Sequence, residues 1–304
     1  MQQEERSFDV SLRSYQKTIH ENLTAFFLGS DRSPDLTSRA AIYSLMAGGK
    51  RIRPVLMLAV SELLHISTEI ILPFACAIEM IHTYSLIHDD LPCMDNDDTR
   101  RGMPTCHVQF SEPVALLAGD ALLNRSYEIL LAACSDGNIG KIHAAGFLAA
   151  MAGSQGMIGG QTIDILSAGQ KIPEETLRTM HKMKTGCLLT AAVVLPVFLM
   201  NESKMQHEIE SGLQRFSEHL GLGFQIKDDL LDVTSTKEIL GKSIGKDAEE
   251  DKSTFVTLFS IEKAQTMLEA EMNLAHNELI LLRGYGLDTV FLEEMSTFLL
   301  HREK

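Results

Sequence analysis

A dense run of acidic side chains stands in the first third of the chain, between two apolar segments. The run reads HDDLPCMDNDD and covers residues 88–98. The flanking segments IEMIHTYSLI and VALLAGDALL have the composition of a protein core. A buried carboxylate without a partner is costly, and neighbouring carboxylates repel one another. The run therefore predicts a positively charged partner at this place.

A second acidic motif, KDDLLD, covers residues 227–232. Successive residues of an α-helix turn by about 100°, so side chains four apart lie on one face. Asp228 and Asp232 have this spacing, and Asp229 lies beside them. The motif can therefore place two or three carboxylates around one cation.

The first motif has a different spacing, because Asp89 and Asp95 are six residues apart. On a regular helix they would face different ways. Pro92 removes a helical hydrogen bond and disfavours helix at the residue before it. If the chain loops out at Pro92-Cys93, the two aspartates regain the equivalent of a four-residue spacing and can share a metal.

Carboxylate oxygens suit Mg²⁺ or Mn²⁺, and Mg²⁺ is commonly bound together with substrate phosphates. The sequence contains no HExxH motif and no Cys/His quartet, so zinc is not expected. A phosphorylated substrate also needs basic groups. Four segments supply them: GGKRIRP (48–54), TRRG (99–102), HKMKTG (181–186) and GKSIGKDAEEDKS (241–253).

The elements that must position these motifs are helices. Apolar residues recur at helical spacing, and alternating strand patterns are scarce. The pattern predicts an all-α fold, one domain over residues 1–304 with about ten helices. The clearest helical segments are 36–49, 53–65, 73–90, 113–134, 173–195, 209–233 and 255–282. We interpret the polar loop 234–253 as part of the site.

Composition excludes several functions. A formal net charge of −14 over 304 residues argues against nucleic acid as a partner. Five scattered Cys without a CxxC pair predict reduced thiols in the cytoplasm. The polar N-terminus is unlike a signal peptide. The longest apolar run, 188–200, is too short to span a bilayer, so we expect a soluble protein without stable membrane insertion.

Taken together, the motifs resemble the short-chain trans-prenyl diphosphate synthases. The resemblance covers about residues 40–253 and depends on GGKRIRP, HTYSLIHDDLPCMDNDDTRRG, GGQTID, KTG, FQIKDDLLD and GKSIGKD, in the order and spacing of that family. It implies a helical bundle of the isoprenoid synthase type around a central cavity. In that family the two acidic motifs face each other and hold three Mg²⁺ ions, which grip an allylic diphosphate.

The resemblance also assigns roles to individual residues. It places the metal ligands at Asp89, Asp95 and Asp228, with Asp90, Asp229 and Asp232 in support. Asn96 departs from the family, which usually has Asp there. The resemblance assigns binding of the allylic diphosphate to Arg100, Lys184, Thr185, Gln225 and Lys242. It assigns binding of isopentenyl diphosphate to Lys50, Arg53, His82 and Arg101. Lys252 joins the substrate-binding set, while Asp164 either lines the cavity with Gln161 or pairs with a nearby base.

The implied reaction is a Mg²⁺-dependent head-to-tail (1′–4) condensation of isopentenyl diphosphate with dimethylallyl or geranyl diphosphate, releasing pyrophosphate. Tyr84 lies five residues before Asp89, about 7.5 Å back along the helix. Its ring is expected to form the floor of the tail cavity, with Ser85 sharing this role. The aromatic floor and the Pro92-Cys93 insertion resemble the bacterial farnesyl diphosphate synthases, so the expected product is farnesyl diphosphate.

Three alternatives remain open. A geranylgeranyl diphosphate synthase would make the twenty-carbon product with the same machinery. A terpene cyclase also uses acidic motifs and Mg²⁺, but it needs neither GGKRIRP nor Arg101. A non-catalytic prenyltransferase subunit would lack acidic-motif residues, which are present here. The resemblance further implies a homodimer.

Overall fold

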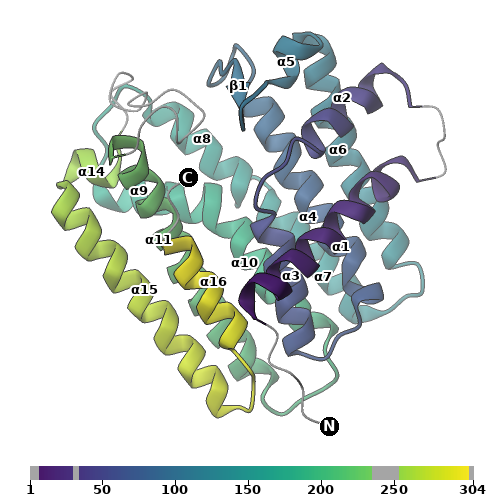
Figure 1. Ribbon diagram of the computed structural model, residues 1–304, viewed down its shortest axis with the longest axis vertical. Coiled ribbons are helices and arrows are strands. Elements are labelled where there is room, and N and C mark those ends of the chain that lie inside the picture. The colour runs from purple at the N-terminus through teal and green to yellow at the C-terminus, as the bar shows by residue number, and fades with distance from the viewer. Residues whose placement is uncertain (1–6, 30–33, 235–252, 301–304) are drawn as a thin grey trace. The chain divides into compact units, whose positions relative to one another are not determined.

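Helices make up most of the described chain, and the structure shows one short hairpin besides them, which confirms the all-α prediction (Figure 1). The computed structural model describes residues 7–29, 34–234 and 253–300. A short antiparallel hairpin, which the helical pattern did not predict, pairs Arg100 with Met103. The elements are α1 Phe8–Leu28, α2 Leu36–Leu45, α3 Ile52–Leu63, α4 Thr68–Asp89, β1 Thr99–Arg100, β2 Met103–Pro104, α5 Cys106–Gln109, α6 Glu112–Ala133, α7 Ile139–Ala152, α8 Met157–Ser167, α9 Glu174–His181, the π-helix η1 Lys182–Gly186, α10 Cys187–Val194, the 3₁₀-helix η2 Leu195–Leu199, α11 Gln206–Thr234, α14 Phe255–Leu258, α15 Ile261–Gly284 and α16 Val290–Leu300.

The helices gather into two compact units, and the boundary falls inside α7. The N-terminal unit covers Met1–Ala145 and the C-terminal unit covers Gly146–Lys304. The first acidic motif belongs to the N-terminal unit and the second to the C-terminal unit. A single domain over residues 1–304 stays a prediction.

The N-terminal unit is built around α4, which packs mainly against α6 and α3. Nearly every side chain from Phe74 to Ile81 is buried, as expected for an all-round apolar helix. The predicted start at Pro73 is wrong, because the helix already begins at Thr68 and contains Pro73 in its interior. This buried helix carries the first acidic motif at its C-terminal end.

The C-terminal unit is built around the pair α11 and α15. Its core gathers Leu177 and Met180 of α9, Ile226 and Leu230 of α11, and Phe255 of α14. The prediction of one helix over 255–282 is wrong, because the chain breaks after α14. Ser260 starts a new helix there by accepting a hydrogen bond from the Lys263 backbone amide (3.2 Å).

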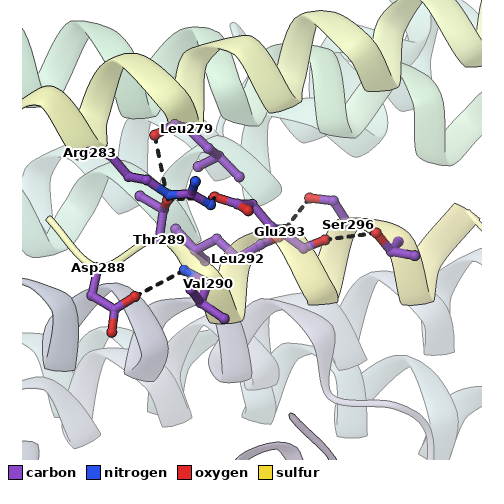
Figure 2. Close-up of polar contacts among 9 residues, drawn as sticks. Leu279, Arg283, Asp288, Thr289, Val290, Leu292, Glu293 and Ser296 are labelled. Carbon is purple, nitrogen blue, oxygen red and sulfur yellow. Dashed lines mark hydrogen bonds and ion pairs between the residues drawn. The ribbon is translucent and has the colours of Figure 1, made fainter. Parts of the chain in front are cut away.

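The turn between α15 and α16 is fixed by side chains (Figure 2). Thr289 is fully buried, accepts a hydrogen bond from Arg283 Nε (3.0 Å) and donates one to Glu293 Oε1 (2.7 Å). Arg283 also forms an ion pair with Glu293. These contacts satisfy the polar groups of the turn and hold the last described helix to its neighbour.

Two helical stretches are long and apolar enough to cross a membrane by length and composition, Thr68–Asp89 and Glu174–Leu199. The apolar run 188–200 is therefore part of a longer helical stretch, so its length alone did not settle the matter. Most of the apolar window of each stretch is buried, 67% and 61%. Core helices of soluble proteins are mostly buried in this way.

Candidate active site

The first acidic motif forms a wide turn at the end of α4. The backbone amide of Asp95 donates to the carbonyl of Asp89 (2.8 Å), and that of Asn96 donates to Leu91 (3.1 Å). Exposed Pro92 and Cys93 lie inside the turn. Asp89 and Asp95 thus come together although they are six apart, which confirms the predicted looping-out.

Asp90, the second aspartate of the motif, pairs with Arg100 of strand β1. The Arg100 Nε donates to both oxygens of Asp90 (2.8 and 3.0 Å), and its Nη2 lies 2.6 Å from Oδ1. Burial raises the pKa of Asp90, while the hydrogen bonds from Arg100 act in the opposite direction. Asp90 is only 3% exposed, so it orients Arg100 rather than facing solvent.

The β1–β2 hairpin places Arg101 at its tip. Arg101 and Gly102 have φ of 55° and 76°, the backbone of a two-residue type I′ turn. The Arg101 guanidinium donates to the carbonyl of Gly48, in the loop before α3. A side chain at Gly49 would meet this guanidinium at 2.7 Å, so the glycine permits the contact.

Two predicted contacts of the second diphosphate, Arg53 and Arg101, act electrostatically on a third, His82 of α4. Burial lowers the pKa of His82 well below its usual value, and Arg53, Arg101, Arg100 and Arg51 lower it further. Four guanidinium groups from two segments therefore lie close enough to act on one neutral imidazole. Such a cluster suits an anion that carries more than one negative charge.

Lys50, also predicted for this pocket, lies half-buried in the loop before α3. Its carbonyl accepts a hydrogen bond from Gln16 Nε2 of α1 (3.0 Å), which fixes the backbone at this point. Lys50 and Arg53 thus flank the same loop and helix start that the hairpin contacts through Gly48.

Tyr84 is buried on α4, one turn before the acidic motif. Its ring meets the ring of His88 edge to face (5.7 Å), and its hydroxyl has no hydrogen-bond partner among the described residues. Burial raises the pKa of Tyr84 to about 12. The Ser85 hydroxyl donates back to the carbonyl of His82 (2.9 Å).

His88 is held by α6 and not by the acidic motif. Its Nε2 lies 3.0 Å from the carbonyl of Leu116, and a side chain at Gly119 would meet the ring at 2.1 Å. The close approach is possible because Gly119 has no Cβ. These contacts give His88 a structural place and fix the ring against which Tyr84 packs.

The second acidic motif occupies the last two turns of α11. Asp228 and Asp232 lie four apart on this helix, as predicted, and both are half-buried. Asp229 is buried and accepts hydrogen bonds from the Phe255 backbone amide (2.8 Å) and Gln225 Nε2 (3.3 Å). Asp229 therefore anchors the start of α14, which sequence reasoning missed.

Two further predicted residues join this network. The Thr185 hydroxyl donates to Gln225 Oε1 (3.0 Å), so Thr185, Gln225 and Asp229 form a chain of contacts. Thr185 belongs to the KTG motif, which adopts the π-helix η1. A π-helical turn re-aims side chains within a helix and is frequent at functional sites.

Lys184 of the same π-helix pairs with Asp164 of α8, with Nζ 2.5 Å from Oδ2. The backbones touch as well, since a side chain at Gly160 would meet the Lys184 amide nitrogen at 2.1 Å. Asp164 was predicted either to line the cavity or to pair with a nearby base, and the structure shows it paired with the base Lys184. Gln161 lies beside it with both amide atoms buried and unpartnered among the described residues.

Some predictions lie outside the described residues, namely Lys242, Lys252 and the segment 241–251 of the last basic motif. Among the described residues, no three His, Cys, Asp or Glu side chains gather closely enough to hold a metal ion by themselves. The metal set predicted by resemblance draws on both units, and it stays a prediction.

Sequence reasoning missed two buried groups. Glu79 stands in the apolar helix α4, where an acid requires a partner, and it pairs with Arg51. His181 is buried with neither ring nitrogen hydrogen-bonded among the described residues, and burial lowers its pKa to about 4. The signal for Glu79 was present in the sequence as a lone carboxylate among apolar neighbours.

Comparison with known proteins decides the family. Residues 34–278 match the model of the polyprenyl synthetase family. The farnesyl diphosphate synthase of Bacillus subtilis is 40% identical over 294 residues, which are 96% of this chain and 97% of the relative. The chain belongs to the polyprenyl synthetase family. It is a prenyltransferase, as the motifs implied.

Other members of the polyprenyl synthetase family extend the comparison. The chloroplastic geranylgeranyl pyrophosphate synthase 7 of Arabidopsis thaliana is 45% identical over 251 residues, 82% of this chain and 72% of the relative. A crystal structure of a Helicobacter pylori geranyltransferase, complexed with magnesium and isoprenyl diphosphate, superposes with a TM-score of 0.80. It is 32% identical and covers 98% of each chain.

Proposed function

We propose that this prenyltransferase condenses isopentenyl diphosphate head-to-tail with dimethylallyl diphosphate and then geranyl diphosphate, giving farnesyl diphosphate and pyrophosphate. In each round the bond from allylic C1 to the diphosphate oxygen breaks. The double bond of isopentenyl diphosphate supplies the electrons of the new C4–C1′ bond, and a proton leaves its C2. The cytoplasm, as location, and a homodimer belong to the same proposal.

The two acidic motifs fit Mg²⁺ in their donor chemistry. Asp89 and Asp95 are joined at the backbone by a 2.8 Å hydrogen bond, and Asp228 and Asp232 share one face of α11. Carboxylate oxygens are the ligands that Mg²⁺ prefers, with Mn²⁺ as a substitute. Bound Mg²⁺, three ions by resemblance, would supply positive charge to a departing diphosphate. The magnesium complex of the Helicobacter relative supports this assignment.

The cation cluster around His82 is the observation that carries the two-substrate reaction. An enzyme with one diphosphate substrate has no use for a second anion pocket away from its metal ligands. Arg53 and Arg101 lie close enough to depress the pKa of His82, and Lys50 flanks them. Of this cluster we assign Arg53 and Arg101, together with Lys50, to isopentenyl diphosphate, with neutral His82 as a hydrogen-bond donor. A terpene cyclase would not need it.

The allylic diphosphate is assigned to Arg100 and to the network of the π-helix. Arg100 is held in place by Asp90, and Lys184 by Asp164. Because Asp90 already orients Arg100, little freedom of that side chain is lost when a diphosphate binds, whereas the diphosphate must share Lys184 with Asp164. Thr185 and Gln225 complete this set, with Lys242 proposed from the resemblance.

Tyr84 supports the fifteen-carbon product. Its ring is fixed on one side by His88, which α6 holds through Leu116 and Gly119. A ring so restrained cannot easily rotate aside for a longer tail. The geranylgeranyl synthase of Arabidopsis, 45% identical, supports the twenty-carbon product as the second candidate.

Chain-length analysis of the products formed with Mg²⁺ tests the proposal. Wild type should stop at farnesyl diphosphate, and Tyr84→Ala should shift the products towards longer chains without abolishing turnover. The truncation should also cost about 3–5 kcal/mol of stability, because it leaves a cavity in the core.

Phe74→Ala is the matched control, since it removes a fully buried aromatic ring from the same helix. It should lower the melting temperature similarly and leave the product at fifteen carbons. Wild-type geranylgeranyl diphosphate would favour the second candidate. A Tyr84→Ala enzyme that still releases only farnesyl diphosphate would place the floor elsewhere.

A further inference from the structure

A buried ion pair holds the segment that carries two of the proposed diphosphate contacts. Arg51 stands in that segment, and its guanidinium donates to Glu79 Oε1 (2.5 Å) and to the carbonyl of Leu45 (2.5 Å). The two paired side chains are 4% and 2% exposed. The pair therefore ties the loop before α3 to the middle of α4, deep inside the N-terminal unit.

The backbone at this loop is strained. Arg51 has a φ of +53°, in the left-handed region that side chains other than glycine rarely adopt. Such a conformation persists only where surrounding contacts hold it. The contacts that hold it include the two hydrogen bonds of the guanidinium, the bond from Gln16 to the carbonyl of Lys50, and the helical bond from the Val55 amide to the carbonyl of Arg51 (3.0 Å).

The strained residue sits at the N-cap of α3, directly after Lys50 and two residues before Arg53. The backbone conformation at Arg51 therefore sets the directions in which the side chains of Lys50 and Arg53 point. Glu79 also lies three residues before His82 on α4, so the two share one helical face. One buried carboxylate thus stands behind three of the four predicted contacts to isopentenyl diphosphate.

The charges around His82 also support a role for Glu79 beneath this loop. The side chains of Arg51, Arg53, Arg100 and Arg101 all act on His82 and repel one another before an anion binds. Burial lowers the pKa of Arg101, and the carboxylate of Glu79 is the strongest influence that opposes this. Asp90 pairs with Arg100 and opposes this effect less, so Glu79 is the main buried counter-charge for Arg101.

We propose that Glu79, acting through Arg51, is a positioning residue for the isopentenyl diphosphate pocket. It holds the strained loop in the one conformation that presents Lys50 and Arg53 together, and it offsets the repulsion among the arginines that act on His82. The inference rests on the proposed function of this pocket. It assigns Glu79 no contact with either substrate.

The test compares Glu79→Gln with wild type in steady-state kinetics with both substrates. Glutamine keeps the shape and one acceptor oxygen but removes the charge. The KM for isopentenyl diphosphate should rise about tenfold, as expected when a charge-assisted contact loses its orientation. The KM for geranyl diphosphate should stay within about twofold, because its contacts are assigned elsewhere.

Two further variants separate positioning from plain stability. Arg51→Lys keeps the charge, but one ammonium cannot replace a planar fork that reaches two acceptors, so the same KM should rise. Arg51→Met combined with Glu79→Leu replaces the pair by apolar groups, which often restores stability. Its melting temperature should approach that of wild type while the KM for isopentenyl diphosphate stays raised.

Glu62→Gln is the matched control. This exposed glutamate of α3 accepts a hydrogen bond from the Tyr15 hydroxyl of α1 (2.7 Å), so the substitution also removes a carboxylate that links two elements. Both KM values should stay at their wild-type level. An equal rise for both substrates in Glu79→Gln would overturn the inference, as would an unchanged KM for isopentenyl diphosphate.

If the single variants fail to fold, the apolar double variant tests the inference in their place. A wild-type KM for isopentenyl diphosphate in that variant would make the pair structural and overturn the inference. Calorimetry with isopentenyl diphosphate alone, without metal, distinguishes this failure from failure of the proposed function. A wild-type chain that binds it but condenses nothing would refute the reaction, and weaker binding by Glu79→Gln would still support the positioning role.

Discussion

The two units organise their charged side chains in different ways. In the N-terminal unit, four guanidinium groups crowd around one neutral histidine, and the two acids among them are buried and committed to single arginines. In the C-terminal unit, Lys184 forms an ion pair with Asp164. The arginines that act on His82 outnumber the buried acids that pair with them, whereas Lys184 and Asp164 form a one-to-one pair.

This difference teaches what each unit can do before a ligand arrives. A cluster with surplus positive charge attracts a diphosphate directly, because the anion relieves the repulsion among the arginines. A balanced pair gains less, since a diphosphate must share Lys184 with Asp164. We therefore expect the N-terminal cluster to bind its diphosphate without metal, and the C-terminal unit to depend on cations held by its acidic motif.

The largest expected effect comes from removing one carboxylate in each unit. Asp89→Ala and Asp228→Ala should each lower kcat by several orders of magnitude, because charge on a leaving diphosphate would lose its stabilisation. Neither side chain is fully buried, so the melting temperature should change much less than turnover. Turnover at saturating Mg²⁺ and thermal melts of both variants provide the measurement.

Asp288→Ala serves as the control, because this carboxylate lies at the α15–α16 turn and accepts only a local bond from the Val290 amide (Figure 2). It should leave turnover unchanged. Near-normal activity in both motif variants would contradict the metal assignment. Loss in only one of them would restrict the metal site to that unit.

The second prediction concerns the cations of the two units. Arg53→Ala should raise the KM for isopentenyl diphosphate about 10- to 100-fold, because a charge-assisted contact contributes a few kcal/mol. Lys184→Ala should raise the KM for the allylic substrate instead, and by a smaller factor, since the wild-type lysine first has to leave Asp164. Steady-state kinetics with each substrate varied in turn measures both effects.

Asp164→Asn gives a matched comparison for the lysine. It keeps the size of the side chain and removes the charge that competes with the diphosphate, so allylic binding should be as tight as in wild type or tighter. Equal effects of Arg53→Ala and Lys184→Ala on both substrates would argue against separate pockets. Weaker allylic binding by Asp164→Asn would mean that the pair orients Lys184 rather than competing for it.

Much of this site could be predicted because its chemistry is local in sequence. The four-residue spacing of Asp228 and Asp232 needs only a helix, and an apolar pattern of 209–233 supplies it. The proline at position 92 sufficed to predict the wide turn that joins Asp89 to Asp95. The all-α fold followed from helical periodicity in the same way.

The rest depends on contacts between distant segments, which periodicity does not encode. The β1–β2 hairpin holds Arg100 against Asp90, and no pattern of alternation announces two-residue strands. The π-helix at Lys184 depends on the close approach of Gly160 from α8. Asp229 was expected to support the metal site, whereas its observed partner is the backbone of Phe255, 26 residues away.

A further prediction compares two histidines, one from each unit, whose pKa is lowered by burial. Burial lowers the pKa of His82, where arginines add to the effect, and that of His181, which falls to about 4. A histidine of lowered pKa stays neutral when folded and takes up a proton on unfolding. The stability that it contributes is therefore complete above about pH 6.5 and is lost as the pH falls towards 4.

For His181 the loss should reach roughly 3 kcal/mol between pH 6.5 and 4. His181→Leu removes the proton uptake and both unpartnered ring nitrogens, so it should match or exceed wild type at pH 7.5 and gain on it steadily below pH 6.5. Urea unfolding at several pH values measures the difference. The exposed His276 of α15 provides the control, and His276→Leu should follow the wild-type curve.

The same titration sharpens the contrast between the units. Isopentenyl diphosphate bound in the arginine cluster would offset the charges that act on His82, and so raise the pKa of that imidazole. It has no such effect on His181. Burial is the main cause of the lowered pKa of His181, and the effects of Asp164 and Lys184 on this pKa oppose each other. Adding isopentenyl diphosphate should therefore leave the pH-dependent advantage of His181→Leu unchanged. If the ligand reduced that advantage, the C-terminal unit would also respond to this diphosphate, and the assignment of separate pockets would be wrong.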